Sequence, residues 1–150
     1  PLEEERELIM LVRLMYASRA ADSVGTDELA AILRRSRQDN HAGGITGLLC
    51  LSGGIFLQVL EGGRSQVSAL YNRIAADARH RDVVLLSYEE IGERRFAGWA
   101  MGLIDLSRLN PALLLKYSEA AVLDPYALSG RVSMALFDEL IATASVSCSP

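Results

Sequence analysis

Residues 45–60 read ITGLLCLSGGIFLQVL, two apolar runs separated by a Ser-Gly-Gly sequence at 52–54. Glycines between two apolar runs are a strong β-hairpin signal, so we expect two antiparallel strands joined by a tight turn. In the second strand, Gln58 has apolar neighbours on both faces. An amide group left unpaired in such a strand costs about 1–3 kcal/mol. We therefore expect a polar partner to face Gln58.

A further strand is predicted upstream, over residues 9–17. Alternation of side chains along MLVRLMYASR (10–19) points Arg13 to one face and Tyr16 to the other. Tyr16 and Gln58 are candidates for one polar cluster inside an apolar domain. Taken alone, a tyrosine such as Tyr16 is more often a core residue whose hydroxyl finds a partner.

The rest of the N-terminal two-thirds alternates between helix and strand patterns. Apolar residues at helical spacing predict helices over 26–38, with Thr26 as N-cap, and over 65–78. Runs rich in β-branched and aromatic residues predict strands at 82–91 and 96–104. The order strand, helix, strand, strand, helix, strand, strand is typical of an α+β fold with a ferredoxin-like, five-stranded mixed sheet. Two helices should cover one face of the sheet.

Two apolar stripes follow residue 104. LNPALLLKYSEA (109–120) predicts a short helix, and the spacing of apolar residues over 132–141 predicts a longer one. We expect both to cover the second face of the sheet, although a partner chain would serve equally well. The chain is thus divided into a core, residues 1–104, and a C-terminal helical extension, residues 105–150, within one compact unit.

Composition favours one domain and argues against several functional classes. The chain has 150 residues, 50% of them hydrophobic, and a formal charge of −4, which is opposite to the footprint of a nucleic-acid binder. Cys50 and Cys148 form neither a disulfide framework nor a zinc spacing, and no apolar run approaches the roughly 20 residues of a membrane helix. We expect a soluble cytoplasmic protein that contacts neither membrane nor nucleic acid. His41 and His80 belong to no hydrolase or metal motif, so we expect no enzyme activity.

Other polar residues have structural readings when taken singly. Asn40 would be a C-cap or turn residue, and Arg79-His80 could complement the dipole of the second helix. Glu89-Glu90 and Arg94-Arg95 are interpreted as a solvated strand end and turn. None of these residues decides a function by itself.

Read together, however, four segments resemble the BLUF family, the blue-light sensors that use a flavin. These segments are LVRLMYASR (11–19), SRQDNHAGGITGLLCLSGGIFLQVLEGG (36–63), DARHRDVVLLSYEEI (77–91) and RRFAGWAMG (94–102). The resemblance runs from about Leu11 to Gly102. It implies FAD, or FMN in recombinant preparations, bound between the two helices that cover the sheet.

The resemblance also implies roles for particular residues. Tyr16 and Gln58 match the photoactive tyrosine and glutamine, and Trp99 and Met101 match the switch residues on the last strand of the core. The residues that match flavin contacts are Ile32, Ser36, Asn40, Gln58, Ile74, Asp77, Arg79 and His80. Asp39 departs from the family pattern, because some members carry histidine there.

The mechanism that the resemblance implies begins with Tyr16, which supplies an electron and then a proton by way of Gln58. The rearranged Gln58 donates a new hydrogen bond to the flavin, whose absorption shifts slightly to the red. We expect the change to reach the C-terminal helices through Trp99 and Met101. Since 150 residues leave no room for a cyclase or phosphodiesterase domain, the signal should pass to a separate protein, such as a cyclic-di-GMP enzyme or a transcriptional regulator. We also expect a homo-oligomer.

Two other functions are compatible with the same fold. One is a light-independent regulatory module that binds an amino acid or another metabolite in the groove. The other is a small acylphosphatase-like hydrolase using Asn40 and Arg64, which is weaker because no phosphate-binding loop surrounds them. Bound flavin would discriminate the sensor from both.

Overall fold

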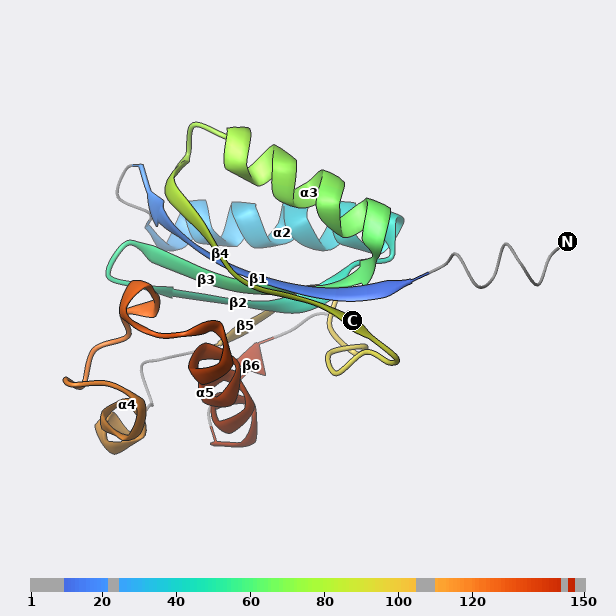
Figure 1. The fold of residues 1–150 in the computed structure, drawn as a ribbon. Helices are drawn as coiled ribbons and strands as arrows, with labels where there is room; N and C mark the ends of the chain where they lie inside the picture. Colours follow the sequence, from blue (N-terminus) through green and yellow to red (C-terminus); the bar gives the residue numbers. More distant parts are fainter. Residues whose placement is uncertain (1–9, 22–24, 105–109, 144–145, 148–150) are drawn as a thin grey trace, which may run out of the picture.

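A twisted sheet lies between two layers of helices (Figure 1). The computed structural model describes residues 10–21, 25–104, 110–143 and 146–147. The strands are β1 (Leu11–Ala20), β2 (Thr46–Ser52), β3 (Ile55–Gly63), β4 (His80–Ile91), β5 (Gly102–Ile104) and β6 (Val146–Ser147). Their order in the sheet is β4-β1-β3-β2-β5-β6, with β2 and β5 parallel and the other pairs antiparallel. The predicted ferredoxin-like α+β sheet is confirmed, and β6 adds a short sixth strand.

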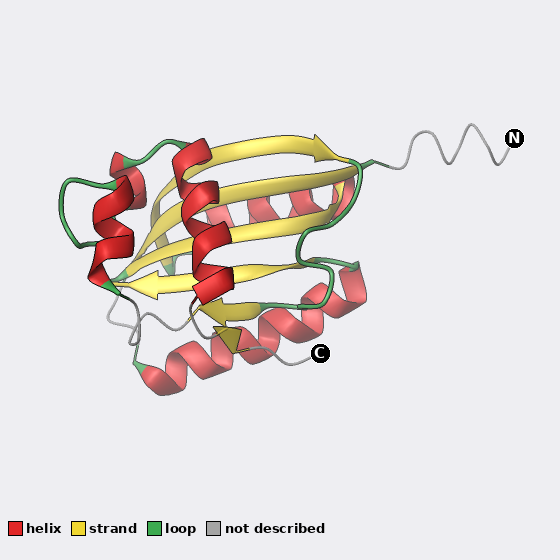
Figure 2. Ribbon diagram, turned by 90° about the horizontal axis from the view of Figure 1, so that it is seen from below, coloured by secondary structure: helices red, strands yellow, loops and turns green. Residues whose placement is uncertain are grey.

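The helices separate into two pairs. Helices α2 (Thr26–Gly43) and α3 (Arg64–Ala76) cover one face, as predicted (Figure 1). Helices α4 (Pro111–Tyr117) and α5 (Gly130–Thr143), with a 3-10 turn η2 (Pro125–Ala127), lie on the opposite face. Seen from below, α5 lies across the strands (Figure 2). The C-terminal helices therefore cover the second face of the sheet. Within the described residues, no helix combines the length and the apolar character that a membrane span requires.

Each face of the sheet has its own apolar core, because side chains alternate along the strands. The core under α2 and α3 contains Val12, Leu14, Tyr16, Phe56, Leu60 and Met101. The core under α4 and α5 contains Met15, Leu57, Val59, Phe96, Leu136 and Phe137. The predicted facing of Tyr16 and Arg13 is thus confirmed, with Tyr16 toward α2 and α3.

The hairpin predicted at residues 52–54 is present. Ser52 pairs with Ile55, and the two residues between them, Gly53 and Gly54, have φ angles of 57° and 76°. Two consecutive positive φ angles are the geometry that tight hairpins favour and that glycine adopts without strain. The turn fixes the register that places Gln58 directly opposite Tyr16 on β1.

Several predicted boundaries are wrong. Strand β1 extends to Ala20, and the predicted start at Ile9 lies outside the described residues. Helix α2 has Gly25 rather than Thr26 as its N-cap, and it continues past residue 38 until Gly44, whose φ of 68° ends it. Asn40 consequently lies in the last turns of the helix and is not its cap.

The largest difference lies before β5. The pattern of residues 96–104 predicts one strand, but only Gly102–Ile104 pairs with the sheet. Residues 92–101, here called the connecting segment, run from β4 to β5 without strand structure. The backbone of this segment is bonded to side chains and to isolated backbone groups instead of to a neighbouring strand. The hydrophobic pattern alone therefore could not show that these residues are not a strand. Trp99 and Met101 lie on this segment, not on the strand.

Candidate functional site

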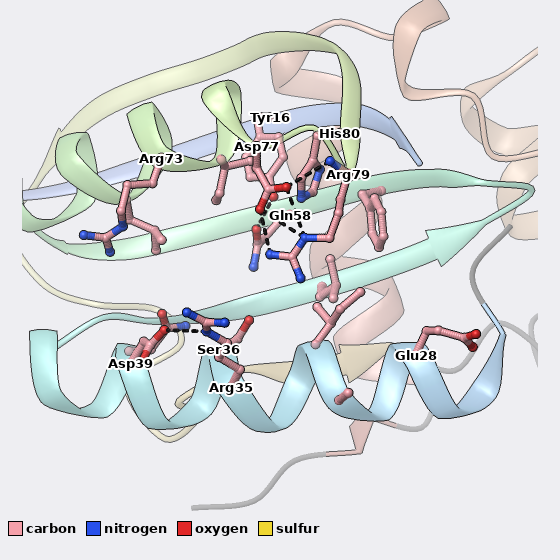
Figure 3. Close-up of a pocket in the computed structure, with 17 residues that line it drawn as sticks. Tyr16, Glu28, Arg35, Ser36, Asp39, Gln58, Arg73, Asp77, Arg79 and His80 are labelled. Atoms are coloured by element: carbon pink, nitrogen blue, oxygen red, sulfur yellow. Dashed lines mark hydrogen bonds and ion pairs between the residues drawn. The ribbon is translucent and has the colours of Figure 1, made fainter. Parts of the chain in front are cut away.

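A cavity of about 620 Å³ opens between α2, α3 and the sheet. We call it the groove (Figure 3). The residues that line it are Tyr16, Glu28, Ala31, Ile32, Arg35, Ser36, Asp39, Asn40, Leu49, Phe56, Gln58, Leu70, Arg73, Ile74, Asp77, Arg79 and His80. Nine of the eleven residues predicted for the site are among them, and the exceptions are Trp99 and Met101.

Gln58 lies on the floor of the groove, bonded on both sides. Its Oε1 accepts a hydrogen bond from Tyr16 Oη, and its Nε2 donates to Met101 Sδ at 3.3 Å. Gln58 is 6% exposed and Tyr16 1%. The polar partner predicted for Gln58 is therefore Tyr16. An amide has two N–H donors and an oxygen with two lone pairs, so Gln58 retains capacity for a ligand in the groove.

Tyr16 is held as a neutral phenol. Burial is the larger cause that raises its pKa, and the nearby Tyr71 raises it further. The rings of Tyr16 and Tyr71 have centroids 5.8 Å apart and are tilted by 59°. Since the hydroxyl keeps its proton at neutral pH, it is a permanent donor to Gln58.

Met101 and Trp99 lie on opposite sides of the sheet. Met101 is fully buried in the core under α2 and α3, in contact with Gln58. Trp99 packs against the other core, with its ring nearly parallel to that of Phe96 at a centroid distance of 6.3 Å. In this structure Met101, rather than Trp99, contacts the glutamine.

Helix α2 binds the end of the connecting segment. Asn40 Nδ2 donates to the carbonyl oxygen of Ala100 at 3.0 Å, and Arg37 Nε donates to that of Met101 at 3.0 Å. Asn40 is buried at the groove, and Ser36 lies one turn earlier on the same face. The second amide hydrogen and the oxygen of Asn40 remain available to a ligand.

Charged side chains stand at the end of the groove where α3 passes into β4 (Figure 3). Arg79 forms a bidentate ion pair with Asp77, with its Nε 3.1 Å from both carboxylate oxygens. Hydrogen bonds from the Arg79 side chain and backbone lower the pKa of Asp77 to about 2. His80 Nδ1 lies 2.7 Å from Ser18 Oγ, and burial lowers the pKa of its imidazole. An anionic group entering here would meet Arg79.

The walls of the groove are apolar, and part of its rim was not predicted. Ile32 of α2 and Ile74 of α3 line it, as predicted. Arg35 and Asp39 form an i,i+4 pair at 3.7 Å on α2, and Arg73 lies on α3. The sequence pattern did not indicate that these three charged residues line a groove, because exposed charges on helices are normally solvated. The groove as a whole suits a flat, largely apolar ligand with one polar edge and an anionic tail.

Other chemistry has little support in the described residues. No group of three or more His, Cys, Asp or Glu side chains within them could hold a metal ion. Burial raises the pKa of the Cys50 thiol to about 12, so that cysteine is not a nucleophile at neutral pH.

The charged residues interpreted as a solvated strand end and turn also have bonding partners in the fold. Arg94 donates to Thr46 Oγ1 at 2.9 Å and to the carbonyl oxygen of Gly44 at 2.6 Å. Arg95 pairs with Asp138, and Glu89 pairs with Arg13, each at 2.8–2.9 Å. The interpretation as a solvated strand end and turn holds for Glu89, Glu90 and Arg95, whose side chains are exposed, and each of the three also has an ion-pair partner distant in sequence.

The chain is similar to known light-sensing proteins in sequence and in structure. The family model described as "Sensors of blue-light using FAD", BLUF, matches residues 11–102. The chain is 40% identical over 84 residues to photoactivated adenylate cyclase subunit alpha of Euglena gracilis, and this match covers 56% of the chain and 8% of the relative. It is 33% identical over 97 residues to the blue light- and temperature-regulated antirepressor BluF of Escherichia coli, with 65% of the chain and 24% of the relative covered.

Among solved structures, that of BlsA in its photo-activated state superposes with a TM-score of 0.80 at 30% identity. The match covers 91% of this chain and 99% of that one. The chain thus spans a small part of the two curated relatives named above but nearly the whole of a solved one. The superposition extends beyond residue 102 into the C-terminal helices.

Proposed function

Because the chain belongs to the BLUF family of blue-light sensors that use FAD, we propose that FAD occupies the groove between α2 and α3 and that Tyr16 and Gln58 are its photoactive pair. The observation that carries this proposal is the hydrogen-bonded series Tyr16, Gln58, Met101 on the floor of the groove. It joins a redox-active phenol to an amide that both accepts and donates hydrogen bonds.

The residues of the groove fit a flavin. Ile32 and Ile74 are the apolar walls for its flat ring system, and the amides of Asn40 and Gln58, with Ser36, are the partners for its carbonyl and N–H edge. Asp77, Arg79 and His80 suit the ribityl and phosphate end, since Arg79 offers a guanidinium to an anion. The same geometry supports FMN as a substitute, because the ring and first phosphate are shared.

The chemistry of the pair follows from its protonation. Bound FAD supplies blue-light absorption and an excited state that takes up an electron. Tyr16 Oη donates to Gln58 Oε1, so a proton that leaves the phenol passes to that oxygen. The Gln58 amide would then turn by half a rotation or convert to its tautomer. Either change would place an acceptor where the Nε2 donor now faces Met101 Sδ. One hydrogen bond is worth about 0.5–1.5 kcal/mol, enough to shift an equilibrium by roughly tenfold.

The output of the chain is assigned to a separate protein. The family's domain is a sensor, and among the relatives it occurs in a photoactivated adenylate cyclase and in an antirepressor. We infer that this chain is not itself an enzyme and that its C-terminal helices signal to a partner such as a cyclic-di-GMP enzyme or a transcriptional regulator. Self-association through the same helices is part of this proposal.

The test is an absorption spectrum before and after blue light, followed through dark recovery. We expect a flavin spectrum that shifts slightly to the red and returns. Gln58→Leu should bind flavin and lose the shift, whereas Gln66→Leu, the same exchange at an exposed position on α3, should keep it. A protein that stays colourless after reconstitution with FAD would contradict the proposal and favour the metabolite-binding module.

A further inference from the structure

Glu61 is a fully buried carboxylate near the end of β3. Its Oε2 accepts from Arg13 Nε at 2.8 Å, and the two side chains form an ion pair. Its Oε1 accepts from the backbone N–H of Phe96 at 2.7 Å and from that of Arg95 at 3.0 Å. The carboxylate therefore bonds to the sheet on one side and to the connecting segment on the other.

An ion pair with Arg13 would not by itself require the contacts to residues 95 and 96. Removing a carboxylate from water is costly unless its oxygens are hydrogen-bonded. Here, two consecutive backbone N–H groups of a segment without strand structure supply those bonds. Glu61 thus accepts hydrogen bonds from backbone N–H groups of the connecting segment, as the carbonyl groups of a neighbouring strand would in a sheet.

The other end of the connecting segment is bound on the groove side. The carbonyl oxygens of Trp99, Ala100 and Met101 accept from Gly47 N, Asn40 Nδ2 and Arg37 Nε respectively, each at 3.0 Å. The segment is therefore attached near its start by Glu61 and at its end by β2 and α2. Phe96 and Trp99, one at each of these two attachments, pack in the core under α5.

The start of the segment also contacts α5 directly. Arg95 Nη1 lies 2.9 Å from Asp138 Oδ1 and 3.0 Å from Oδ2. The backbone of Arg95 is bonded to Glu61 while its side chain is bonded to α5. One residue thus joins the carboxylate to the C-terminal helices.

We propose that Glu61 is a positioning residue of the sensor: its carboxylate fixes the connecting segment in the arrangement that places Met101 against Gln58, and Arg95–Asp138 passes any shift of that segment to α5. This inference rests on the proposed function. Glu61 does not line the groove, so its effect on the switch is exerted through the segment. The path from groove to helices runs along the connecting segment rather than through the central strands.

Two variants separate this role from a general stabilising one. Glu61→Gln keeps the size of the side chain but replaces one acceptor oxygen with a donor that faces other donors. Glu89→Gln is the matched control, because Glu89 pairs with the same Arg13, has a side chain 52% exposed and is bonded to Arg13 rather than to the connecting segment. Both variants remove one negative partner of Arg13.

Trp99 is the single tryptophan of the chain and reports on the segment. In Glu61→Gln we expect exchange of the Arg95 and Phe96 amides to quicken by about tenfold, the effect of one lost charge-assisted hydrogen bond, and acrylamide quenching of Trp99 to rise. The light-dependent change in exchange of α5 should disappear, while the flavin red shift remains. Glu89→Gln should match the parent in all four measurements.

The outcomes distinguish the inference from the function on which it rests. If Glu61→Gln and Glu89→Gln behave alike, the positioning role is overturned, and a retained red shift leaves the photosensor proposal intact. If the parent shows no red shift, the proposed function fails, and the dark amide and tryptophan measurements still decide whether Glu61 holds the segment. Should Glu61→Gln not fold, the double variant Arg13→Met with Glu61→Gln, which removes both charges of the buried pair, takes its place with the same expectations.

Discussion

At the scale of single residues, His80 lies between the floor of the groove and its charged end. Its ring centroid is 5.2 Å from that of Phe56 and 6.4 Å from that of Tyr16. Burial is the main cause that lowers its pKa, Arg79 lowers it further, and Asp77 opposes both. The folded protein therefore favours the neutral imidazole.

His80 should make stability depend on pH in the weakly acidic range. An unfolded histidine titrates near pH 6.5 and binds a proton more readily than folded His80, so the contribution to stability is full above about pH 6.5 and is lost as pH falls below it. Between pH 7.5 and 5.5 we expect the Tm of the parent to fall more than that of His80→Gln. Asp77, with its pKa of about 2, stays ionised in both. Equal falls in Tm would contradict this prediction.

Residue types predicted the residues at the centre of the groove better than the residues that hold the connecting segment. Gln58 stood out because an amide in an apolar strand must find a partner, and that partner proved to be Tyr16. Arg37 and Glu61 carried no such signal, since arginine on a helix and glutamate at a strand end are usually solvated. Their importance comes from partners 64 and 35 residues away, Met101 and Phe96, which only the folded chain brings near.

At the scale of elements, Gly130 decides how α5 meets the sheet. A Cβ atom at Gly130 would lie 2.2 Å from the carbonyl oxygen of Leu86 on β4. Real contacts of that kind do not occur, so the first turn of α5 can approach β4 this closely only with glycine. Helix α5 is therefore docked by backbone contact as well as by its apolar side chains.

Gly130→Ala should lift the start of α5 away from β4. Overpacking of this kind costs about 1–3 kcal/mol, which urea unfolding would measure, and hydrogen exchange in α5 should increase. Gly92→Ala is the control, because a Cβ atom added at Gly92 would meet nothing within 4 Å. The flavin spectrum should stay unchanged in both variants. A Gly130→Ala protein as stable as Gly92→Ala would show that α5 shifts without penalty.

Elements with local signals were predictable, and the connecting segment was not. Two glycines indicate the hairpin, and apolar spacing indicates α2 and α3. Residues 96–101 carry the same apolar pattern as a strand, but Glu61 and α2 satisfy backbone groups there instead of a neighbouring strand. Tertiary contacts overrode the pattern.

At the scale of the whole molecule, the sheet separates the groove from the C-terminal helices. The connecting segment passes from one core to the other, with Met101 in the first and Phe96 and Trp99 in the second. A change at Gln58 can therefore reach α5 by moving this segment while the central strands stay fixed.

Met101→Ala tests that route. The variant removes the side chain that contacts the Gln58 amide, so the flavin red shift should persist while the light-dependent hydrogen exchange of α4 and α5 is lost. Truncating a buried methionine or leucine to alanine costs about 2–5 kcal/mol, so a control of equal burial is needed. Leu60→Ala serves, because Leu60 is fully buried in the same core. It should lose comparable stability in urea and keep the light response. If Met101→Ala keeps it too, the signal leaves the groove by a path that does not include Met101, and α2, which holds the same segment through Arg37 and Asn40, becomes the element to examine.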